Sequence, residues 1–373
     1  MLSEPTRPHY HQFSHSLLSL AILTAAIYLG QDILVPLAMA GLIAVLLRPL
    51  EDRLVRLGMH KVIAISVALL LTIVVMTGLT MLLSMQLSDF TDDLPKLRQN
   101  LSNVVDDARR WVRREYNVSY REQAKYLRKA QTQTLDGLQG AGALGVITGP
   151  LGTLGTLTLV PIYVFLLLYY RSMLLHFVVV LFPERHTERV RAILDEVKAV
   201  IQSYVVGLLI ETVCVTALNS IGLLVLGVQY AVLLGIIAAI LNLIPYIGGL
   251  VATVLIMFVT FGNQPDLSIM LGVLGVFLFV QFIDNNVLVP LIVASKVRVN
   301  ALVSIVGVLV GGALAGVSGM FLSIPVIAIM KVIFDRVDSL RPWGVLLGDQ
   351  TPEQAGSNLF RLKRRRKAVA IES

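Results

Sequence analysis

Charged residues are scarce in this chain, and cysteine is almost missing. Cys214 is the only cysteine among 373 residues, which excludes an intrachain disulfide framework and a metal site built from several thiolates. Aspartate, glutamate, lysine and arginine together make up 15% of the sequence, whereas hydrophobic residues make up 56%. A soluble domain cannot bury so large an apolar fraction. Composition and long apolar runs therefore predict a polytopic membrane protein.

The motifs of nucleotide-driven pumps and membrane proteases are also missing. The sequence contains no GxxxxGKS or GxxxxGKT loop, no HExxH helix and no GxSxG elbow. The segment that begins at His186 reads His-Thr-Glu-Arg and lacks the second histidine of a zinc-binding helix. We therefore expect a protein that is not an enzyme, with no catalytic residues and no cofactor.

Apolar runs alternate with polar links along an all-α chain and predict about eight hydrophobic segments. Two regions, 230–262 and 301–333, are long and interrupted by glycine and proline, so we interpret them as hairpins. The predicted parts are a tail with three membrane segments (1–87), a small soluble helical insertion (88–144), a fourth membrane segment (145–170), an amphipathic helix region (171–203), a C-terminal membrane core (204–335) and a basic tail (336–373).

Further predictions concern how the helices join. Residues 16–47 are expected to form two short helices that turn at 30–32, followed by a polar link over 48–58. Residues 185–200 carry one apolar face among charged residues, which is typical of a helix on a membrane or protein surface. We expect this surface helix to be separate from the fifth span, at 204–226.

The distribution of lysine and arginine predicts the orientation. The links 48–61 and 171–202 contain four and five basic residues, whereas the three short links expected on the other face contain none. Because basic residues are enriched on the cytoplasmic side, we expect both termini in the cytoplasm and the insertion at 88–144 outside it. The run Arg361–Lys367 is then a tail near anionic lipid, and nucleic acid is not an expected partner.

The stretch from Asn242 to Gly249 interrupts a long apolar segment. Pro245 lacks a backbone donor, and Gly248 and Gly249 permit a sharp turn. Backbone groups freed at membrane depth must be satisfied by protein or water. Two interpretations remain open: a tight turn between short helices at the membrane surface, or a broken helix that lines a transport site.

Ionisable residues inside predicted spans are candidates for function. Glu211 lies in the fifth span near Thr212, Thr216 and Asn219, where a carboxylate can exchange a proton or coordinate a cation. It can equally be a protonated side chain bonded to a neighbouring helix, or a residue at the membrane interface.

A second polar group precedes Pro290. Asp284 is flanked by Gln281, Asn285 and Asn286, and four oxygen-bearing side chains this close together can bind a hydrophilic solute or Na⁺. They can also cap a broken helix end, and the two roles are compatible.

Several motifs in the C-terminal half resemble the autoinducer-2 exporter family of bacterial permeases. They are Ile244-Pro245-Tyr246-Ile247-Gly248-Gly249, the segment from Gln281 to Pro290, the link from Leu226 to Ala231, and the glycine-rich ending from Val310 to Pro325. Gln229 stands where the family's link has proline. The resemblance is specific over 200–335 and architectural before that. It implies about eight hydrophobic segments, an extracytoplasmic insertion after the third, and a homo-oligomer in the bacterial inner membrane.

The leading hypothesis is a permease that exports a small polar solute, and the resemblance makes autoinducer-2 one candidate. The residues predicted to line its pathway are Glu211, Asn242, Pro245, Gly248, Gly249, Gln281, Asp284, Asn285 and Asn286. The second hypothesis is a Na⁺(Li⁺)/H⁺ antiporter in which Glu211 and Asp284 bind the ions. A third, of another class, is a non-transporting membrane scaffold that acts through its insertion and the surface helix. Membrane lipid and the solute or ions are the expected partners.

Overall fold

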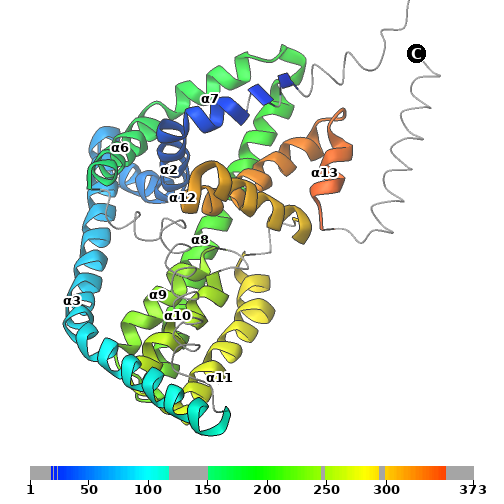
Figure 1. Cartoon of the computed structure of the whole chain (residues 1–373). Helices are drawn as coiled ribbons and strands as arrows, with labels where there is room; N and C mark the ends of the chain where they lie inside the picture. The colour runs from blue at the N-terminus through cyan, green and yellow to red at the C-terminus, as the bar shows by residue number, and fades with distance from the viewer. Residues whose placement is uncertain are drawn as a thin grey trace, which may run out of the picture. The chain divides into compact units, whose positions relative to one another are not determined.

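The computed structural model describes residues 18–19, 21–22, 24–116, 150–244, 248–293 and 299–349. The regular elements in these ranges are helices, and one isolated antiparallel bridge joins Val299 to Gly348 (Figure 1). The predicted all-α class is therefore confirmed. The chain divides into two compact units: unit 1 comprises 1–62, 162–205 and 296–373, and unit 2 comprises 63–161 and 206–295.

Five of the described helices are long and apolar enough to cross a membrane, and six spans result if one bent pair counts as a span. The five helices are Gln31–Arg56, Lys61–Ser88, Glu184–Val225, Leu267–Ile292 and Ala301–Arg336. The bent pair joins Thr158–Tyr169 to Arg171–Val180 at an angle of 65°. These lengths and compositions identify a multi-pass membrane protein.

Unit 1 is built from helices at both ends and in the middle of the chain. Its elements are α2 (Gln31–Arg56), α7 (Arg171–Val180), the 3₁₀-helix η1 (Glu184–His186), α12 (Ala301–Arg336), α13 (Arg341–Leu347) and the adjoining parts of α6 (Pro150–Tyr169) and α8 (Thr187–Val225). α12 packs against α2 and α13. Val200 of α8 packs with Ala328 and Val332 of α12 in a small apolar core.

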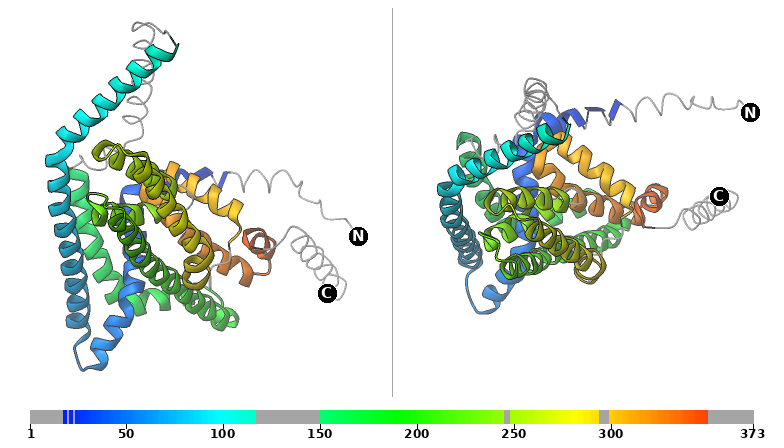
Figure 2. Two further views of the ribbon diagram at one scale, coloured as in Figure 1. Left: turned by 90° about the horizontal axis from the view of Figure 1, so that it is seen from below. Right: turned by 60° about the horizontal axis from the view of Figure 1, so that its bottom comes forward.

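α12 is a hairpin. Ala315 and Gly316 leave the helical conformation, and Gly316 adopts φ +58°, a region that favours glycine because other residues carry a Cβ. The two arms then approach closely, since a Cβ added to Gly319 would lie 2.0 Å from the carbonyl oxygen of Gly311. The glycine-broken hairpin predicted for 301–333 is confirmed, and Figure 2 shows this folded-back helix in orange.

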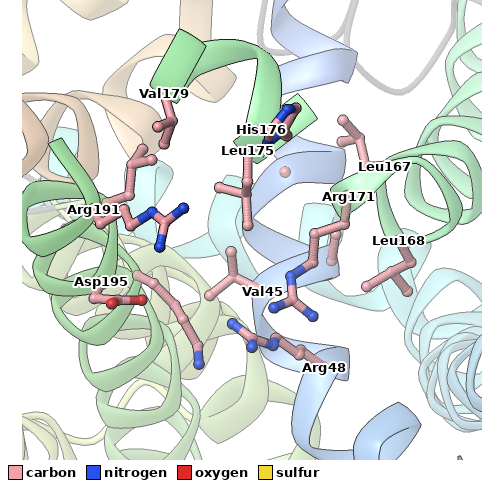
Figure 3. A pocket seen from close by; sticks show the side chains of 14 residues that line it. Val45, Arg48, Leu167, Leu168, Arg171, Leu175, His176, Val179, Arg191 and Asp195 are labelled. Carbon is pink, nitrogen blue, oxygen red and sulfur yellow. The ribbon is translucent and has the colours of Figure 1, made fainter. Parts of the chain in front are cut away.

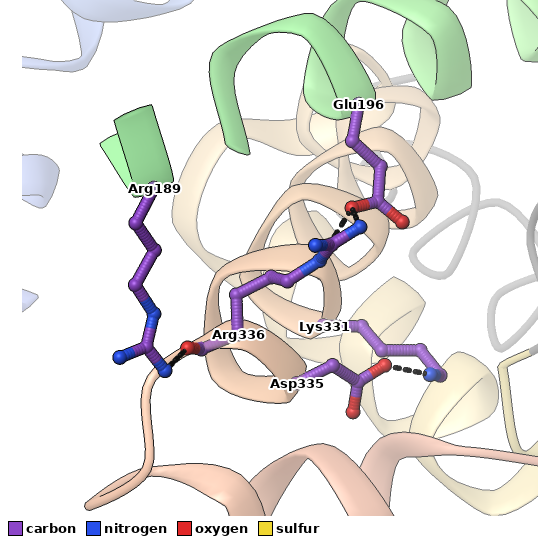
Figure 4. A network of polar contacts seen from close by, with 5 residues as sticks. All are labelled: Arg189, Glu196, Lys331, Asp335 and Arg336. Carbon is purple, nitrogen blue, oxygen red and sulfur yellow. Dashed lines mark hydrogen bonds and ion pairs between the residues drawn. The ribbon is translucent and has the colours of Figure 1, made fainter. Parts of the chain in front are cut away.

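Charged side chains join the first half of α8 to the end of α12 (Figure 4). Arg336 Nη2 lies 2.7 Å from Glu196 Oε2, and Arg189 Nη2 lies 3.0 Å from Asp338 Oδ2. Arg189 also donates a hydrogen bond to the carbonyl oxygen of Arg336. These contacts connect this part of α8 to the end of α12 and the residues that follow it.

Unit 2 contains most of α3 (Lys61–Tyr116), the second half of α8, α9 (Ala231–Asn242), α10 (Gly248–Asn263), α11 (Leu267–Ile283) and the π-helix η2 (Asp284–Val293). α10 packs against both α9 and α11, so α9 and α10 form the hairpin predicted for 230–262. Large apolar side chains such as Leu234, Ile256 and Phe277 are buried between these helices.

Side-chain caps determine where two helices begin. Asp266 precedes α11, and its carboxylate accepts a 2.7 Å hydrogen bond from the backbone nitrogen of Ser268. Asn300 precedes α12 and accepts a 2.8 Å bond from the backbone nitrogen of Leu302. Each cap satisfies a backbone donor that the first turn of a helix leaves without an intrahelical partner.

Predicted helix boundaries were wrong at several links. α2 extends to Arg56, so it includes most of the expected polar link and two residues of the expected turn. α8 is one helix, which makes the surface helix and the fifth span continuous. α3 likewise continues from the third span into the insertion as far as Tyr116. Charged residues such as Glu, Lys and Arg are good helix formers, so a polar link does not end a helix. The rest of the insertion, residues 117–144, and the run 361–367 lie outside the described residues.

Candidate functional site

Buried polar side chains of unit 2 gather beside the α9–α10 hairpin. Asp284 is only 3% exposed, and its Oδ2 accepts a 2.9 Å hydrogen bond from Nδ2 of Asn242, the last residue of α9. The other carboxylate oxygen, Oδ1, has no hydrogen-bond partner among the described residues. Asp284 therefore holds the end of α9, and its second oxygen is left to the neighbouring carboxyl group or to a ligand.

Glu211 reaches the same carboxyl group from α8. Its side chain is 8% exposed and lies within interaction distance of Asp284. Two carboxyl groups this close hold a proton or a cation between them more readily than they hold two negative charges. The pair therefore offers the groups that proton exchange or cation binding would require.

Asn219 lies two turns beyond Glu211 on α8 and completes the buried cluster. It is 2% exposed, and its Oδ1 has no partner in the part of the chain that the structure describes. A buried polar atom left without a hydrogen bond costs about 1–3 kcal/mol, which a ligand with a donor would recover. In the sequence, Asn219 stands out only as a neighbour of Glu211. The signal that singles it out is helical spacing, because residues eight apart share one face.

Glycines at the start of α10 permit this close approach. A Cβ added to Gly249 would lie 2.4 Å from Gln281 Oε1 and 3.3 Å from Asn242 Oδ1. A Cβ added to Gly248 would lie 1.8 Å from the carbonyl oxygen of Leu241, so α9 and α10 meet backbone to backbone there. Gly248 therefore needs glycine for space, whereas at Gly249 the end of the Gln281 side chain would have to shift.

A cavity of about 10 Å³ lies inside the cluster. Its polar lining consists of Asn219, Asn242, Gln281 and Asp284. This volume admits about one water-sized body. No group of three or more His, Cys, Asp or Glu side chains suited to a metal ion occurs among the described residues. Asp284 is the ionisable residue of this lining, and Glu211 is not part of it.

Other residues of the predicted pathway lie elsewhere. Asn285 and Asn286 are exposed, and Asn286 Nδ2 donates a 2.8 Å hydrogen bond to a carbonyl oxygen of its own helix. Pro245 lies outside the described residues. The helix does not end before Pro290: at Asp284 it changes from α-helix to the π-helix η2, which includes this proline. π-helical turns are rare and frequently occur at functional sites.

Comparison with known proteins gives a consistent match over most of the chain. The model of the AI-2E family transporter matches residues 17–339. YhhT of Escherichia coli K12, provisionally named a transport protein, is 24% identical over 341 residues, which cover 90% of this chain and 94% of YhhT. YrrI of Bacillus subtilis, provisionally named likewise, is 25% identical over 308 residues, or 81% and 86% of the two chains. TqsA of E. coli K12, named an AI-2 transport protein, is 26% identical over 338 residues, or 90% and 94%. Since the family pattern runs from the first apolar segment past the end of α12, this chain belongs to the AI-2E transporter family.

Proposed function

We propose that this protein is a bacterial inner-membrane permease that exports a small polar solute through unit 2. The observation that carries the proposal is the buried contact between Asp284 and Asn242, beside a carboxylate oxygen that has no partner among the described residues. Membership of a transporter family supports movement of a solute, because the relatives compared are named for transport.

The lengths of α9 and α10 support a site at membrane depth. The helices have 12 and 16 residues, or about 18 Å and about 24 Å at the α-helical rise per residue. Both are shorter than the hydrocarbon core of a bilayer, which is about 30 Å thick. A hairpin of this length that enters the bilayer turns within it, near Asn242 and Gly248. The N-terminus of α10 also favours electronegative groups at this turn.

The chemistry of the cluster suits a solute with hydroxyl groups. Oδ1 of Asn219 and Oδ1 of Asp284 are acceptors without partners in the described part of the chain. Because TqsA is named for AI-2 transport, autoinducer-2 is the first solute to test. The cavity of about 10 Å³ is too small for such a molecule. Transport in this proposal therefore requires the α9–α10 hairpin to move away from α8 and α11.

The paired carboxyl groups favour a second candidate function, Na⁺(Li⁺)/H⁺ antiport. The carboxyl groups of Glu211 and Asp284 lie near each other, and a proton and a cation would compete for their oxygens. Such competition is what couples the two ions in an exchanger. In this case the amide oxygens of Asn219 and Gln281 would complete the coordination of the cation.

Flux in sealed vesicles separates these functions. Purified protein is reconstituted and tested for counterflow of autoinducer-2, and separately for proton movement driven by Na⁺ or Li⁺. We expect Glu211→Gln and Asp284→Asn to lower the relevant flux by about tenfold or more, which corresponds to about 1.4 kcal/mol. Asn285→Ala and Asn286→Ala are matched controls, because these polar neighbours are exposed.

Two outcomes would contradict the proposal. Unchanged flux in both carboxyl variants removes the cluster from the pathway. A wild-type protein that moves neither solute nor ions, while its insertion binds a stable partner, supports the scaffold hypothesis instead.

The proposal also includes cytoplasmic termini, an extracytoplasmic insertion and a homo-oligomer. Replacing Cys214 with serine gives a background without thiols, in which single cysteines at Ser3 and Ser102 report the two sides. We expect an impermeant thiol reagent applied outside inner-membrane spheroplasts to label position 102 and to spare position 3. The reverse pattern would invert the topology, and mass measurement in detergent tests the oligomer.

A further inference from the structure

Unit 1 contains a larger cavity that the proposed transport pathway does not use. Its volume is about 510 Å³, and its lining comes from α2, the end of α6, α7 and the first half of α8 (Figure 3). Small-molecule sites occupy about 300–1,000 Å³. The cavity is therefore large enough for a ligand of that class.

Basic side chains from separate helices converge on this cavity. Arg48 comes from α2, Arg171 from the first turn of α7, and Arg191 and Lys198 from α8. The charges of Arg48, Arg171 and Lys198 lie close enough to act on one another. Asp195 is the acidic residue of the lining. Like charges that face one space repel each other unless an anion neutralises them.

The protein itself neutralises these cations poorly. Arg48 Nε lies 3.6 Å from Asp52 Oδ2, which is too far for a hydrogen bond, and it is buried without a hydrogen-bond partner in the described ranges. No ion pair among the described residues joins Arg171, Arg191 or Lys198 to a carboxylate. Arg189 and Arg336 of the same unit differ, because each has a carboxylate partner within 3.0 Å. Asp195 in the lining and the nearby Asp52 and Glu51 offset part of this positive charge, but the basic side chains of the lining still outnumber its acid.

Apart from His176, the rest of the lining is apolar. It consists mainly of aliphatic side chains on α2, α6 and α7: Val45, Leu167, Leu168, Leu175 and Val179. A cavity whose lining combines cationic and aliphatic side chains matches a ligand with an anionic head and a hydrocarbon chain. A second hollow beside Arg48 and Lys198 adds Arg53 and Arg56, so the basic surface continues beyond the cavity.

We propose that this cavity binds an anionic phospholipid, with the phosphate among Arg48, Arg171 and Lys198 and the first part of an acyl chain along α6 and α7. Guanidinium groups match phosphate oxygens in pairs, and the lysine adds a point charge. Orientation alone accounts for basic residues in cytoplasmic links. It does not account for their convergence on one half-apolar cavity, which is the arrangement that recognises lipid head groups at the cytoplasmic leaflet.

Lipid binding by the purified full-length protein in detergent tests this site without any transport assay. Bound lipid is counted by native mass spectrometry during titration with phosphatidylglycerol, and in parallel with phosphatidylcholine of the same acyl chains. We expect the phosphatidylglycerol affinity of Arg171→Gln/Lys198→Gln to fall by about tenfold or more, because two charge-assisted contacts are removed. Arg185→Gln/Arg341→Gln is the matched control, since both residues are exposed basic residues of unit 1 outside the cavity lining.

Further variants and ligands distinguish loss of the binding site from loss of folding or of general charge. The charge-conserving variant Arg171→Lys/Lys198→Arg should retain most of the phosphatidylglycerol binding, and Arg191→Gln replaces the double variant if that one fails to fold. Equal binding of phosphatidylcholine, or equal loss in the control variant, would overturn the site. Inorganic phosphate that binds at low millimolar concentration and displaces phosphatidylglycerol would assign the cavity to a soluble phosphate compound and overturn the lipid proposal.

Discussion

The two units use polar groups in opposite ways. In unit 2, the Asp284 carboxyl group and amide side chains surround a cavity of about 10 Å³. The close backbone contact at Gly248 sets the distance between α9 and α10. In unit 1, arginine and lysine side chains face a cavity of about 510 Å³, and the basic residues of the lining outnumber its one acid, Asp195. The first site depends on the fit of the backbone, and the second depends on net charge. One added methyl group should damage the first, whereas only a change of charge or ionic strength should affect the second.

The strongest test of the backbone fit is Gly248→Ala. The new Cβ would lie 1.8 Å from the carbonyl oxygen of Leu241, and a backbone atom cannot move aside as a side chain can. Overpacking costs about 1–3 kcal/mol, and the α9–α10 hairpin would have to open to relieve it. We expect a clear fall in the thermal midpoint of the detergent-purified protein, together with loss of flux.

The matched control is Gly275→Ala, a glycine of α11 in the same unit with nothing within 4 Å of an added Cβ. We expect no destabilisation there, because alanine is the better helix former by about 1 kcal/mol. Similar midpoints for both variants would show that backbone contact does not hold the hairpin.

Asn242→Ala tests the hydrogen bond at the centre of the small site. It removes the donor that lies 2.9 Å from Asp284 Oδ2 and leaves a buried carboxylate with one partner fewer. We expect flux to fall by about tenfold, since losing a hydrogen bond to a charged group costs about 1.5–3 kcal/mol. Asn286→Ala changes the same side chain at an exposed position and should leave flux close to that of the wild type. Equal flux in the two variants would argue that the Asn242 contact is only structural.

A change of ionic strength should affect ligand binding at the two sites differently, although the difference should be smaller than the effects of the substitutions above. Raising salt from about 0.1 M to about 1 M shortens the Debye length from about 10 Å to about 3 Å. Phosphatidylglycerol binding at the basic cavity should weaken several-fold, whereas autoinducer-2 affinity at the buried cluster should change little. Native mass spectrometry at several concentrations of a volatile salt measures the first effect, and counterflow measures the second. Salt-insensitive lipid binding would contradict an electrostatic site.

The smallest expected effect concerns the ion pair between Arg336 and Glu196. Both side chains are largely open to solvent, with 50% and 40% exposure. Exposed pairs contribute about 0–1 kcal/mol, so Arg336→Gln and Glu196→Gln should each shift the thermal midpoint only slightly. A double-mutant cycle gives the coupling free energy. A coupling well above 1 kcal/mol would mean that this contact, and not the apolar core around Val200, holds α8 against α12.

The hairpins could be predicted because the residues that break each helix, glycine and proline, lie at the break itself. Gly316 takes a positive φ, and Gly311 and Gly319 sit where the two arms of α12 touch. Glycine and proline inside an apolar run signal such a turn without any knowledge of distant residues. Helix continuity was predicted less well. Lys198 and Gln202 interrupt the apolar pattern of α8, but neither ends the helix, because tertiary packing and helix propensity favour its continuation.

The candidate sites were predictable only in part. Asp284, Asn285 and Asn286 are consecutive, and only the helix phase in the structure separates the buried aspartate from its exposed neighbours. Sequence analysis interpreted Arg48 and Arg171 as markers of orientation. They are more than 100 residues apart in the chain, and no local pattern indicates that they line one cavity.

The π-helix that follows Asp284 has a consequence for movement. Its hydrogen bonds connect residues five apart, whereas α-helical bonds connect residues four apart, so each turn takes up extra chain. The ten residues of η2, which follow the carboxylate that holds α9, are therefore wound into a shorter helix than the same residues would form with α-helical bonding. If η2 tightened to α-type bonding, it would lengthen and rotate the residues beyond it without unfolding. Asp284 therefore lies at the boundary between α-type and π-type hydrogen bonding.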